Sequence, residues 1–335
     1  MAEDRRMLKL FTLDPLHIGV GQDIMGEVDL PVDRESETGV PRIPGTALKG
    51  GFRAHAAWKL KMDGKKDKPC PGDQPEDGKT AAERTRSDYC PIESCPICQT
   101  FGFPSLNIQE KQIAGHEGRV YFRDARLAFF PALTDKGTLW FSTPGRAAAW
   151  LELKGYEHPE LLMADGDLAL SVNQKEPIQD LRVGWIAVSG IEQNSTEAQV
   201  QQVVEALRNS TLQFPTKKYW QHIVSKTVLL DEKHFYRLVE TCLERRTCNR
   251  VDQDTGTVAQ GALFSYEALP RASLLCSRIF AETSLPGTIE GGYDSPLAVC
   301  KLAKEGFARM GIGGMQTRGL GSLLIELSSR EVGNG

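Results

Sequence analysis

The sequence lacks long hydrophobic runs. Although 40% of its 335 residues are hydrophobic, no stretch approaches the roughly 18 consecutive apolar residues that a membrane-spanning helix needs. Residues 1–16 contain basic side chains but neither an uninterrupted apolar segment nor a small-residue cleavage site, which argues against a signal peptide. We therefore expect a cytoplasmic protein with no membrane partner.

The sequence also lacks an excess of positive charge: 40 Lys and Arg stand against 44 Asp and Glu, for a formal charge of −4. Stand-alone nucleic-acid-binding proteins usually carry surplus cations that neutralise phosphates. Any such role here needs a local patch. The segment 34–68 offers one, with nine cationic and four acidic residues, although residues 59–68 alone fit a solvated surface.

Nucleotide-binding motifs are missing as well. The pattern GxxxxGK[ST] is absent, and neither glycine-rich loop satisfies GxGxxG, which argues against hydrolysis of nucleoside triphosphates. No RNP1-type aromatic motif is present either, so stacking of bases on an RRM-like sheet is not the expected binding mode.

Cysteine is present in an informative pattern, because four of the eight cysteines lie between positions 70 and 98. Cys95 and Cys98 form a CxxC motif, with Cys90 and Cys70 close enough to complete a four-thiolate set. In a reducing compartment this set predicts a closed, structural zinc site. A redox pair at Cys95 and Cys98 is the alternative, and His55 or His116 could replace Cys70 as a ligand.

Hydrophobic periodicity predicts an α+β fold of ferredoxin-like type. A strand at 8–13 leads into a long loop and then a helix with Thr46 as its N-cap, while 62–86 reads as an insertion. The further expected elements are strands at 118–130, 138–143, 274–280 and 322–327, helices near 200–207 and 235–243, a hairpin-like excursion at 247–273, and a helix from Ser295 that Gly306 ends or weakens.

The loop from His17 to Pro44 gathers residues suited to chemistry. Lys49, in the first turn of the following helix, together with the free N–H groups of that turn, predicts an anion site suited to phosphate. Candidate general bases or metal ligands are Asp29, Asp33 and Glu35, and candidate charge stabilisers are His17 and Arg34. Each could instead be a solvated loop residue, and spacing does not choose among them.

A second glycine-rich loop runs from Gly311 to Gly321. The glycines around Gln316, Thr317 and Arg318 could form a backbone nest that holds an anion. A flexible turn between a helix and a strand explains the same composition.

Together these motifs resemble a known family. The opening PLHIGVG, GEVDLPVDRE and TGVPRIPGTALKG, the excursion DTGTVAQGALFSYEALP and the closing GIGGMQTRGLG are similar to the RAMP proteins of type III CRISPR effector complexes. The order of the motifs and EVDLPVDRE most resemble the RNA-cleaving backbone subunits of the Cmr (type III-B) complex. The likeness spans nearly the whole chain.

The resemblance implies a single RAMP domain over 1–335 with an RRM-like palm, a zinc knuckle at 62–104 and a thumb-like hairpin at 247–273. It implies filaments of this chain on guide RNA, other effector subunits, and cleavage of single-stranded target RNA at regular intervals by Asp29 with Mg²⁺ or Mn²⁺, assisted by His17. The implied RNA contacts are Arg34, Lys49, Arg53, Thr257, Val258, Phe264, Gly313, Gly314, Gln316, Thr317 and Arg318.

Two other functions remain open from the sequence. One is a purely architectural subunit that binds guide RNA without cutting. The other is an endoribonuclease that processes the repeat precursor without a metal ion. The CPICQTFG segment resembles zinc knuckles of related backbone subunits, but a four-cysteine site is not universal among Cmr relatives.

Overall fold

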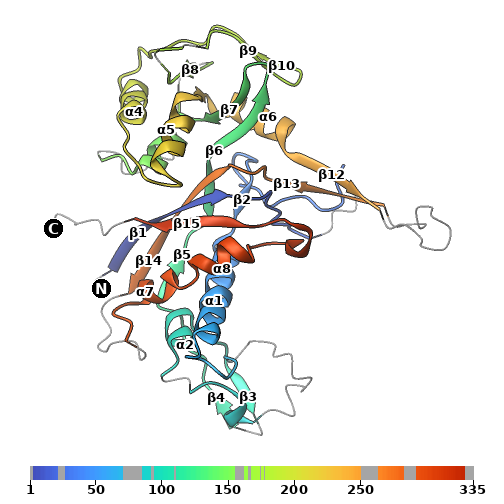
Figure 1. The fold of residues 1–335 in the computed structure, drawn as a ribbon, viewed down its shortest axis with the longest axis vertical. Helices are drawn as coiled ribbons and strands as arrows, with labels where there is room; N and C mark the ends of the chain where they lie inside the picture. The colour runs from blue at the N-terminus through green and yellow to red at the C-terminus, as the bar shows by residue number, and fades with distance from the viewer. Residues whose placement is uncertain are drawn as a thin grey trace.

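The computed structural model describes residues 3–21, 27–70, 85–91, 94–108, 111–154, 162–164, 167–173, 175–176, 178–249, 263–282 and 292–328. Figure 1 shows a central sheet with a helical lobe above it, a second lobe below and an arm of two strands projecting to one side. No helix among these residues is long and apolar enough to cross a bilayer.

The helices are α1 (Gly45–Met62), α2 (Pro96–Phe101), α3 (Pro144–Leu151), α4 (Ala198–Arg208), α5 (Lys217–Ser225), α6 (Glu232–Cys242), α7 (Pro296–Lys301) and α8 (Lys304–Arg309), with 3₁₀ turns η2 (Arg86–Asp88) and η4 (Gln316–Arg318). The strands are β1 (Glu3–Thr12), β2 (Arg42–Ile43), β3 (Leu106–Ile108), β4 (Lys111–Ile113), β5 (Val120–Phe122), β6 (Ala125–Thr134), β7 (Gly137–Ser142), β8 (Ala169–Ser171), β9 (Leu181–Val183), β10 (Ile186–Val188), β11 (Thr227–Leu230), β12 (Glu244–Cys248), β13 (Phe264–Ala268), β14 (Leu274–Glu282) and β15 (Leu323–Leu327).

The central sheet is mixed and has the order β15-β1-β14-β6-β7-β11-β8, with β2 paired to β6 and β5 paired to β14. Neighbouring strands from β15 to β7 are antiparallel, whereas β7 and β11 run parallel. This confirms the mixed α and β composition predicted from periodicity.

The alternation of side chains along β1 builds a core on each face of the sheet. Leu8 and Leu10 point into a cluster with α1, α2, α7 and α8, whereas Met7 and Phe11 point into a second cluster with α3, α4 and α5. The face opposite α1 is covered at one end by the second cluster, and its other end carries polar and aromatic side chains.

The start of α1 differs from the sequence prediction. Pro44, not Thr46, occupies the N-cap position, and no side chain within the segment caps the helix. Asp124, which follows β5, accepts a hydrogen bond from the Gly45 amide at 2.8 Å. A side chain at position 45 would lie 2.3 Å from the Phe122 carbonyl oxygen, so only glycine fits this close approach.

The prediction that Gly306 ends or weakens the helix from Ser295 is also wrong. Helix α7 ends at Lys301, and Gly306 lies inside the separate helix α8. A Cβ at position 306 would lie 2.5 Å from the Cβ of His55, so glycine lets α8 pack closely against α1. Ser295 does cap α7, since its side chain accepts from the Ala298 amide.

The remaining expected elements occur near their predicted positions. Buried Val200, Val203, Val204 and Leu207 form the inner face of α4, as their spacing predicted. β12 and β13 form an antiparallel ladder from Glu244 with Ala268 to Cys248 with Phe264, so the paired strands begin three residues before the predicted excursion at 247–273, of which residues 250–262 lie outside the described part of the chain. Figure 1 shows this pair as the projecting arm.

Capping of α1 from a distant residue gives a testable expectation. Asp124→Ala removes the acceptor for the Gly45 amide and is expected to lower the free energy of unfolding by about 1–2 kcal/mol. Asp124→Asn keeps an acceptor and loses only the partly exposed ion pair with Arg42, so it should cost less. Urea denaturation of the full chain measures both, and equal losses would contradict the capping role.

Candidate nucleic-acid interface and cleavage site

The long loop after β1 lies against strand β13. Leu16 pairs with Leu269, and Leu30 forms a parallel bridge with Tyr266. Two backbone hydrogen bonds of 3.1 Å join Leu30 to Ser265 and Glu267. Strand β13, the half of the arm that leads on to β14 of the central sheet, therefore holds the loop in place.

Asp29 is fixed to the same strand through its side chain. Its Oδ2 accepts hydrogen bonds from the Ser265 amide at 2.7 Å and the Ser265 hydroxyl at 2.9 Å. These two donors hold the pKa of Asp29 below its usual range, against a smaller opposing effect of desolvation. Asp29 is partly exposed, so the carboxylate is not sealed inside the protein.

The three candidate carboxylates of the loop differ in their partners. Asp33 lies 3.3 Å from Arg42, and the buried Glu35 lies 3.0 Å from the buried Arg146. Among the described residues, Asp29 has no Lys or Arg nitrogen within 4.0 Å. Of the three candidates, Asp29 is thus the one whose charge no described cation compensates.

Arg34 is part of an ion-pair network below the loop. Its guanidinium contacts Glu267 at 3.0 Å and Glu240 at 2.7 Å, and donates to the Gly39 carbonyl. Glu267 is buried on β13 and also accepts from the Val32 amide. This network ties the loop to β13 and α6, and it gives Arg34 a positioning role whether or not it meets RNA.

His17 is buried between the loop and the second glycine-rich loop. Its Nδ1 lies 2.7 Å from the Glu267 carbonyl oxygen, so Nδ1 carries the proton and donates, and Nε2 is the acceptor in the neutral ring. A Cβ at Gly19 would lie 2.7 Å from Nε2, and one at Gly314 would lie 3.0 Å from Cδ2. These glycines make room for the imidazole.

Residues 311–321 meet the same site. The Gly314 amide donates to the His17 carbonyl at 2.9 Å. The amides of Arg318 and Gly319 donate within the segment itself, to the carbonyls of Met315 and Gln316. Gln316, Thr317 and Arg318 are exposed. A predicted anion contact would therefore draw largely on these side chains.

Arg318 also connects this loop to the arm, because its guanidinium lies over the Phe264 ring at 5.5 Å from the centroid. The structure thus brings His17, Asp29, Phe264 and the loop of Arg318 together around β13. Thr257 and Val258 lie outside the described residues.

Lys49 and Arg53 lie on α1, one turn apart. Arg53 donates to the Gly102 carbonyl, at the end of α2. Lys49 lines a hollow of about 600 Å³ beside Arg5, Tyr121 and Phe280. Sequence reasoning did not identify those three residues, which come from strands far apart in the chain.

The four predicted metal ligands also come together. Cys70, Cys90, Cys95 and Cys98 are buried, and their sulfurs all lie within 4.8 Å of one another. The separations are 3.7 Å between Cys70 and Cys95 and 3.5 Å between Cys90 and Cys98. These sulfurs could hold a metal ion such as zinc, since tetrahedral bonds of about 2.3 Å place sulfurs roughly 3.8 Å apart.

The two histidines considered in place of Cys70 have other surroundings. His55 Nε2 lies 2.7 Å from the Gly311 carbonyl, with its ring against Phe307, and burial lowers its pKa. His116 is exposed and stacks on Phe103.

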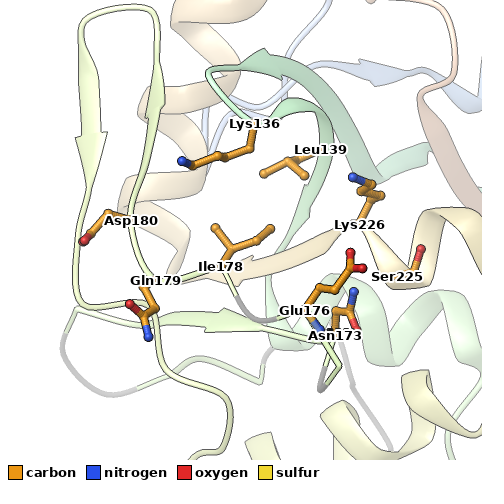
Figure 2. Close-up of a pocket in the computed structure, with 9 residues that line it drawn as sticks. All are labelled: Lys136, Leu139, Asn173, Glu176, Ile178, Gln179, Asp180, Ser225 and Lys226. Atoms are coloured by element: carbon orange, nitrogen blue, oxygen red, sulfur yellow. Dashed lines mark hydrogen bonds between the residues drawn. The ribbon is translucent and has the colours of Figure 1, made fainter.

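Another hollow, of about 440 Å³, lies between the β6–β7 turn, segment 173–180 and the end of α5 (Figure 2). Lys136 and Lys226 face it together with Glu176 and Asp180, so its charges balance. It contains no predicted site residue and offers no net attraction for RNA.

A mixed sheet with a two-stranded arm, and a long loop held against that arm, define the class of α/β protein to which the chain belongs. Residues 9–324 match the RAMP superfamily, and the chain belongs to that superfamily.

Individual relatives agree with this family. The chain is 26% identical, over 98% of its length and 96% of the relative, to the CRISPR system Cmr endoribonuclease Cmr4 of Pyrococcus furiosus. Its fold is similar to oligomeric Cmr4 from Pyrococcus furiosus, with TM-score 0.58, 20% identity and coverage of 99% and 100%. It is also similar to a chain of the type III-B Cmr-beta complex bound to cognate target RNA, with TM-score 0.59, 15% identity and 96% coverage of both.

The Ser265 hydrogen bonds predict a titration difference. Ser265→Ala removes the hydroxyl donor and is expected to raise the pKa of Asp29 toward its usual value, because the ionised form loses a stabilising hydrogen bond. Ser265→Thr keeps the hydroxyl and serves as the control. Carboxyl ¹³C NMR titration, with Asp29→Asn identifying the signal, measures the change, and an unmoved pKa in Ser265→Ala would contradict the assignment.

Proposed function

We propose that this chain is a guide-RNA-binding backbone subunit of a type III-B CRISPR interference complex and that it cleaves complementary target RNA. The observation that carries the proposal is Asp29, the candidate carboxylate that Ser265 of the arm holds in place and that has no Lys or Arg partner among the described residues. The family match and the relative named as a Cmr endoribonuclease support it. Copies of the chain would form a filament on guide RNA beside other effector subunits.

The proposed reaction uses the ribose of the substrate as the nucleophile. The 2′-oxygen attacks the adjacent phosphorus, the bond from phosphorus to the 5′-oxygen breaks, and the proton of the 2′-OH leaves as the 5′-oxygen gains one. The protein must hold the nucleotide so that the attacking and leaving oxygens are in line. The loop on β13 is suited to this because both of its ends are fixed by backbone pairing.

Asp29 and His17 take different parts in this reaction. On β13, Asp29 bonds to Ser265 and His17 bonds to Glu267. These two positions are two residues apart, which corresponds to roughly 7 Å along the strand. Asp29 would hold the 2′-OH or a divalent cation, and a bound Mg²⁺ or Mn²⁺ would neutralise charge on the scissile phosphate. His17, with Nε2 as its acceptor nitrogen, would assist in proton transfer.

The catalytic assignment predicts a separation of cleavage from binding. In assembled complexes, Asp29→Asn should lower the target-cleavage rate by roughly 100-fold or more while leaving target affinity unchanged. Asp33→Asn is the matched control, since its carboxylate is paired with Arg42, and it should keep most activity. Cleavage that survives Asp29→Asn would reject the assignment.

Two controls distinguish the alternatives. EDTA should stop cleavage of target RNA if a divalent cation takes part, whereas metal-independent cutting of precursor RNA would favour a repeat-processing enzyme. Complexes that bind guide and target but never cut, under any metal, would favour a purely architectural subunit.

The four-cysteine cluster is proposed to hold structural Zn²⁺. Soft thiolates favour this ion, and a closed set of four leaves no open coordination position for catalysis. Cys95 lies at the N-cap of α2 and Cys98 in its first turn, so a short helix fixes two of the ligands. The zinc would stabilise the segment 62–104, which would form a knuckle.

Metal analysis tests this site. The purified chain should contain about one zinc ion, and Cys95→Ser should remove it and lower Tm by roughly 5 °C or more. Cys242→Ser, at a cysteine outside the cluster, should change neither. A folded, zinc-free wild-type chain with unchanged Tm would contradict the proposal.

The finer description of the fold is part of the same proposal. The antiparallel order β15-β1-β14-β6, with α1 after β1 and α7 and α8 after β14, supports a ferredoxin-like palm. The β12–β13 pair would be the base of the thumb over 247–273, whose outer part would interrupt the guide–target duplex.

A further inference from the structure

The sheet face opposite α1 carries an unexpected group of side chains at its uncovered end. Arg5 on β1 is paired in register with Phe280 on β14, and Phe280 with Tyr121 on β5. Because directly paired residues point to the same face, these three form a row across three strands. Tyr121 is 47% exposed, which is unusual for a large aromatic side chain on a sheet.

Arginines surround this row. Arg5 and Arg123 lie over the Phe280 ring, with guanidinium carbons 5.5 Å and 5.7 Å from its centroid. Arg278 is on β14 two residues before Phe280, and the exposed Arg126 is paired with Cys276 on the same face. We call Arg5, Tyr121, Arg123, Arg126, Arg278 and Phe280 the arginine–aromatic face.

Two hollows meet on this face. One of about 600 Å³ leads to Lys49, and another of about 830 Å³ leads toward α3 and α6, and both are lined by Arg123 and Phe280. The two hollows are therefore neighbours, and together they form a path of lining residues from the first turn of α1 toward α3 and α6.

The charges along this path favour an anion. Its lining contains seven cationic and four acidic side chains. Three of the acids are already compensated, since Glu35 and Glu232 flank Arg146 and Asp124 contacts Arg42. The formal excess of positive charge lies beside the exposed Tyr121 ring and the half-buried Phe280 ring.

We propose that the arginine–aromatic face binds single-stranded RNA, with bases stacked on Tyr121 and on the Arg5 and Arg123 guanidinium groups that lie over the Phe280 ring, and with phosphates held by Arg126 and Arg278. An aromatic surface interleaved with arginines is the chemistry that binds single strands without reading their sequence. This inference rests on the proposed function. It extends RNA contact from Lys49 onto the sheet, and it adds base stacking there, which the absence of an RNP1 motif gave no reason to expect.

Binding of a fluorescein-labelled oligouridylate to the purified full chain, followed by anisotropy, tests the proposal. Tyr121→Ala and Phe280→Leu should each weaken Kd roughly tenfold with little change in its salt dependence. Arg126→Ala should lower the slope of log K against log salt by about 0.7, because one phosphate contact is lost. Trp185→Ala and Arg182→Ala, on the β9–β10 hairpin, are the matched controls and should change neither quantity.

Assembled complexes identify which strand is bound. A 4-thiouridine is placed either in the guide or in the target. In one of these two experiments it should crosslink to the arginine–aromatic face of the wild-type chain, and Tyr121→Ala should abolish that crosslink. Crosslinking from neither strand would overturn the proposal.

Other results separate the competing explanations. Unchanged Kd in folded Tyr121→Ala and Phe280→Leu would overturn the inference, while cleavage lost in Asp29→Asn would still support the proposed function. If the Tyr121 variant instead changed self-association without RNA and left RNA affinity intact, the face would be an interface between copies, and the RNA proposal would be wrong.

Discussion

The arrangement of the candidate cleavage site depends on one pairing, that of the loop after β1 with strand β13. Leu16 and Leu30 bond to β13 or the residue after it through their backbones, and Asp29 bonds to it through its side chain. The loop alone is rich in glycine and polar residues and has little tendency toward one conformation. Strand pairing supplies the order that its own sequence does not.

This pairing also connects the site to the projecting arm. Ser265 belongs to the strand that forms the arm with β12, so displacement of β13 would carry Asp29 with it. The buried Glu267, two residues on, extends the same connection to Arg34 and α6. A partner that bends or orders the arm would therefore act on the geometry of the carboxylate through hydrogen bonds rather than through distant packing.

The sequence predicted local features well where the chemistry lies in neighbouring residues. Cys95 and Cys98 are about one helical turn apart, and Val200 to Leu207 on α4 span about two turns, so a short segment contains the information. Spacing alone could not separate Asp29 from Asp33 and Glu35, because their partners Ser265, Arg42 and Arg146 are brought to them by the fold, and Ser265 is 236 positions from Asp29. The cap of α1 by Asp124 failed to be predicted for the same reason. Only the resemblance to the RAMP proteins singled out Asp29.

At the glycines, too, the sequence suggested less than the structure shows. The glycines around Gln316, Thr317 and Arg318 suggested a backbone nest for an anion, and the structure adds that Gly314, together with Gly19 of the first loop, makes room for the His17 ring. The residues of the arginine–aromatic face were missed because they alternate along separate strands. Arg278 and Phe280 share a face through their two-residue spacing, but only the pairing of β14 with β1 and β5 places Arg5 and Tyr121 beside them.

The partners of Asp29 finally bear on what this carboxylate can do. An adjacent arginine would cancel its charge, whereas Ser265 contributes neutral donors that stabilise the ionised form and leave its negative charge intact. The lowered pKa makes Asp29 a weak proton acceptor at neutral pH, since general bases act best with a pKa near the working pH. It is better suited to hold a cation or orient a hydroxyl. In the proposed reaction, proton transfer would then fall to a group such as His17, whose Nδ1 donates to the Glu267 carbonyl and whose Nε2 faces the Gly19 side of the loop.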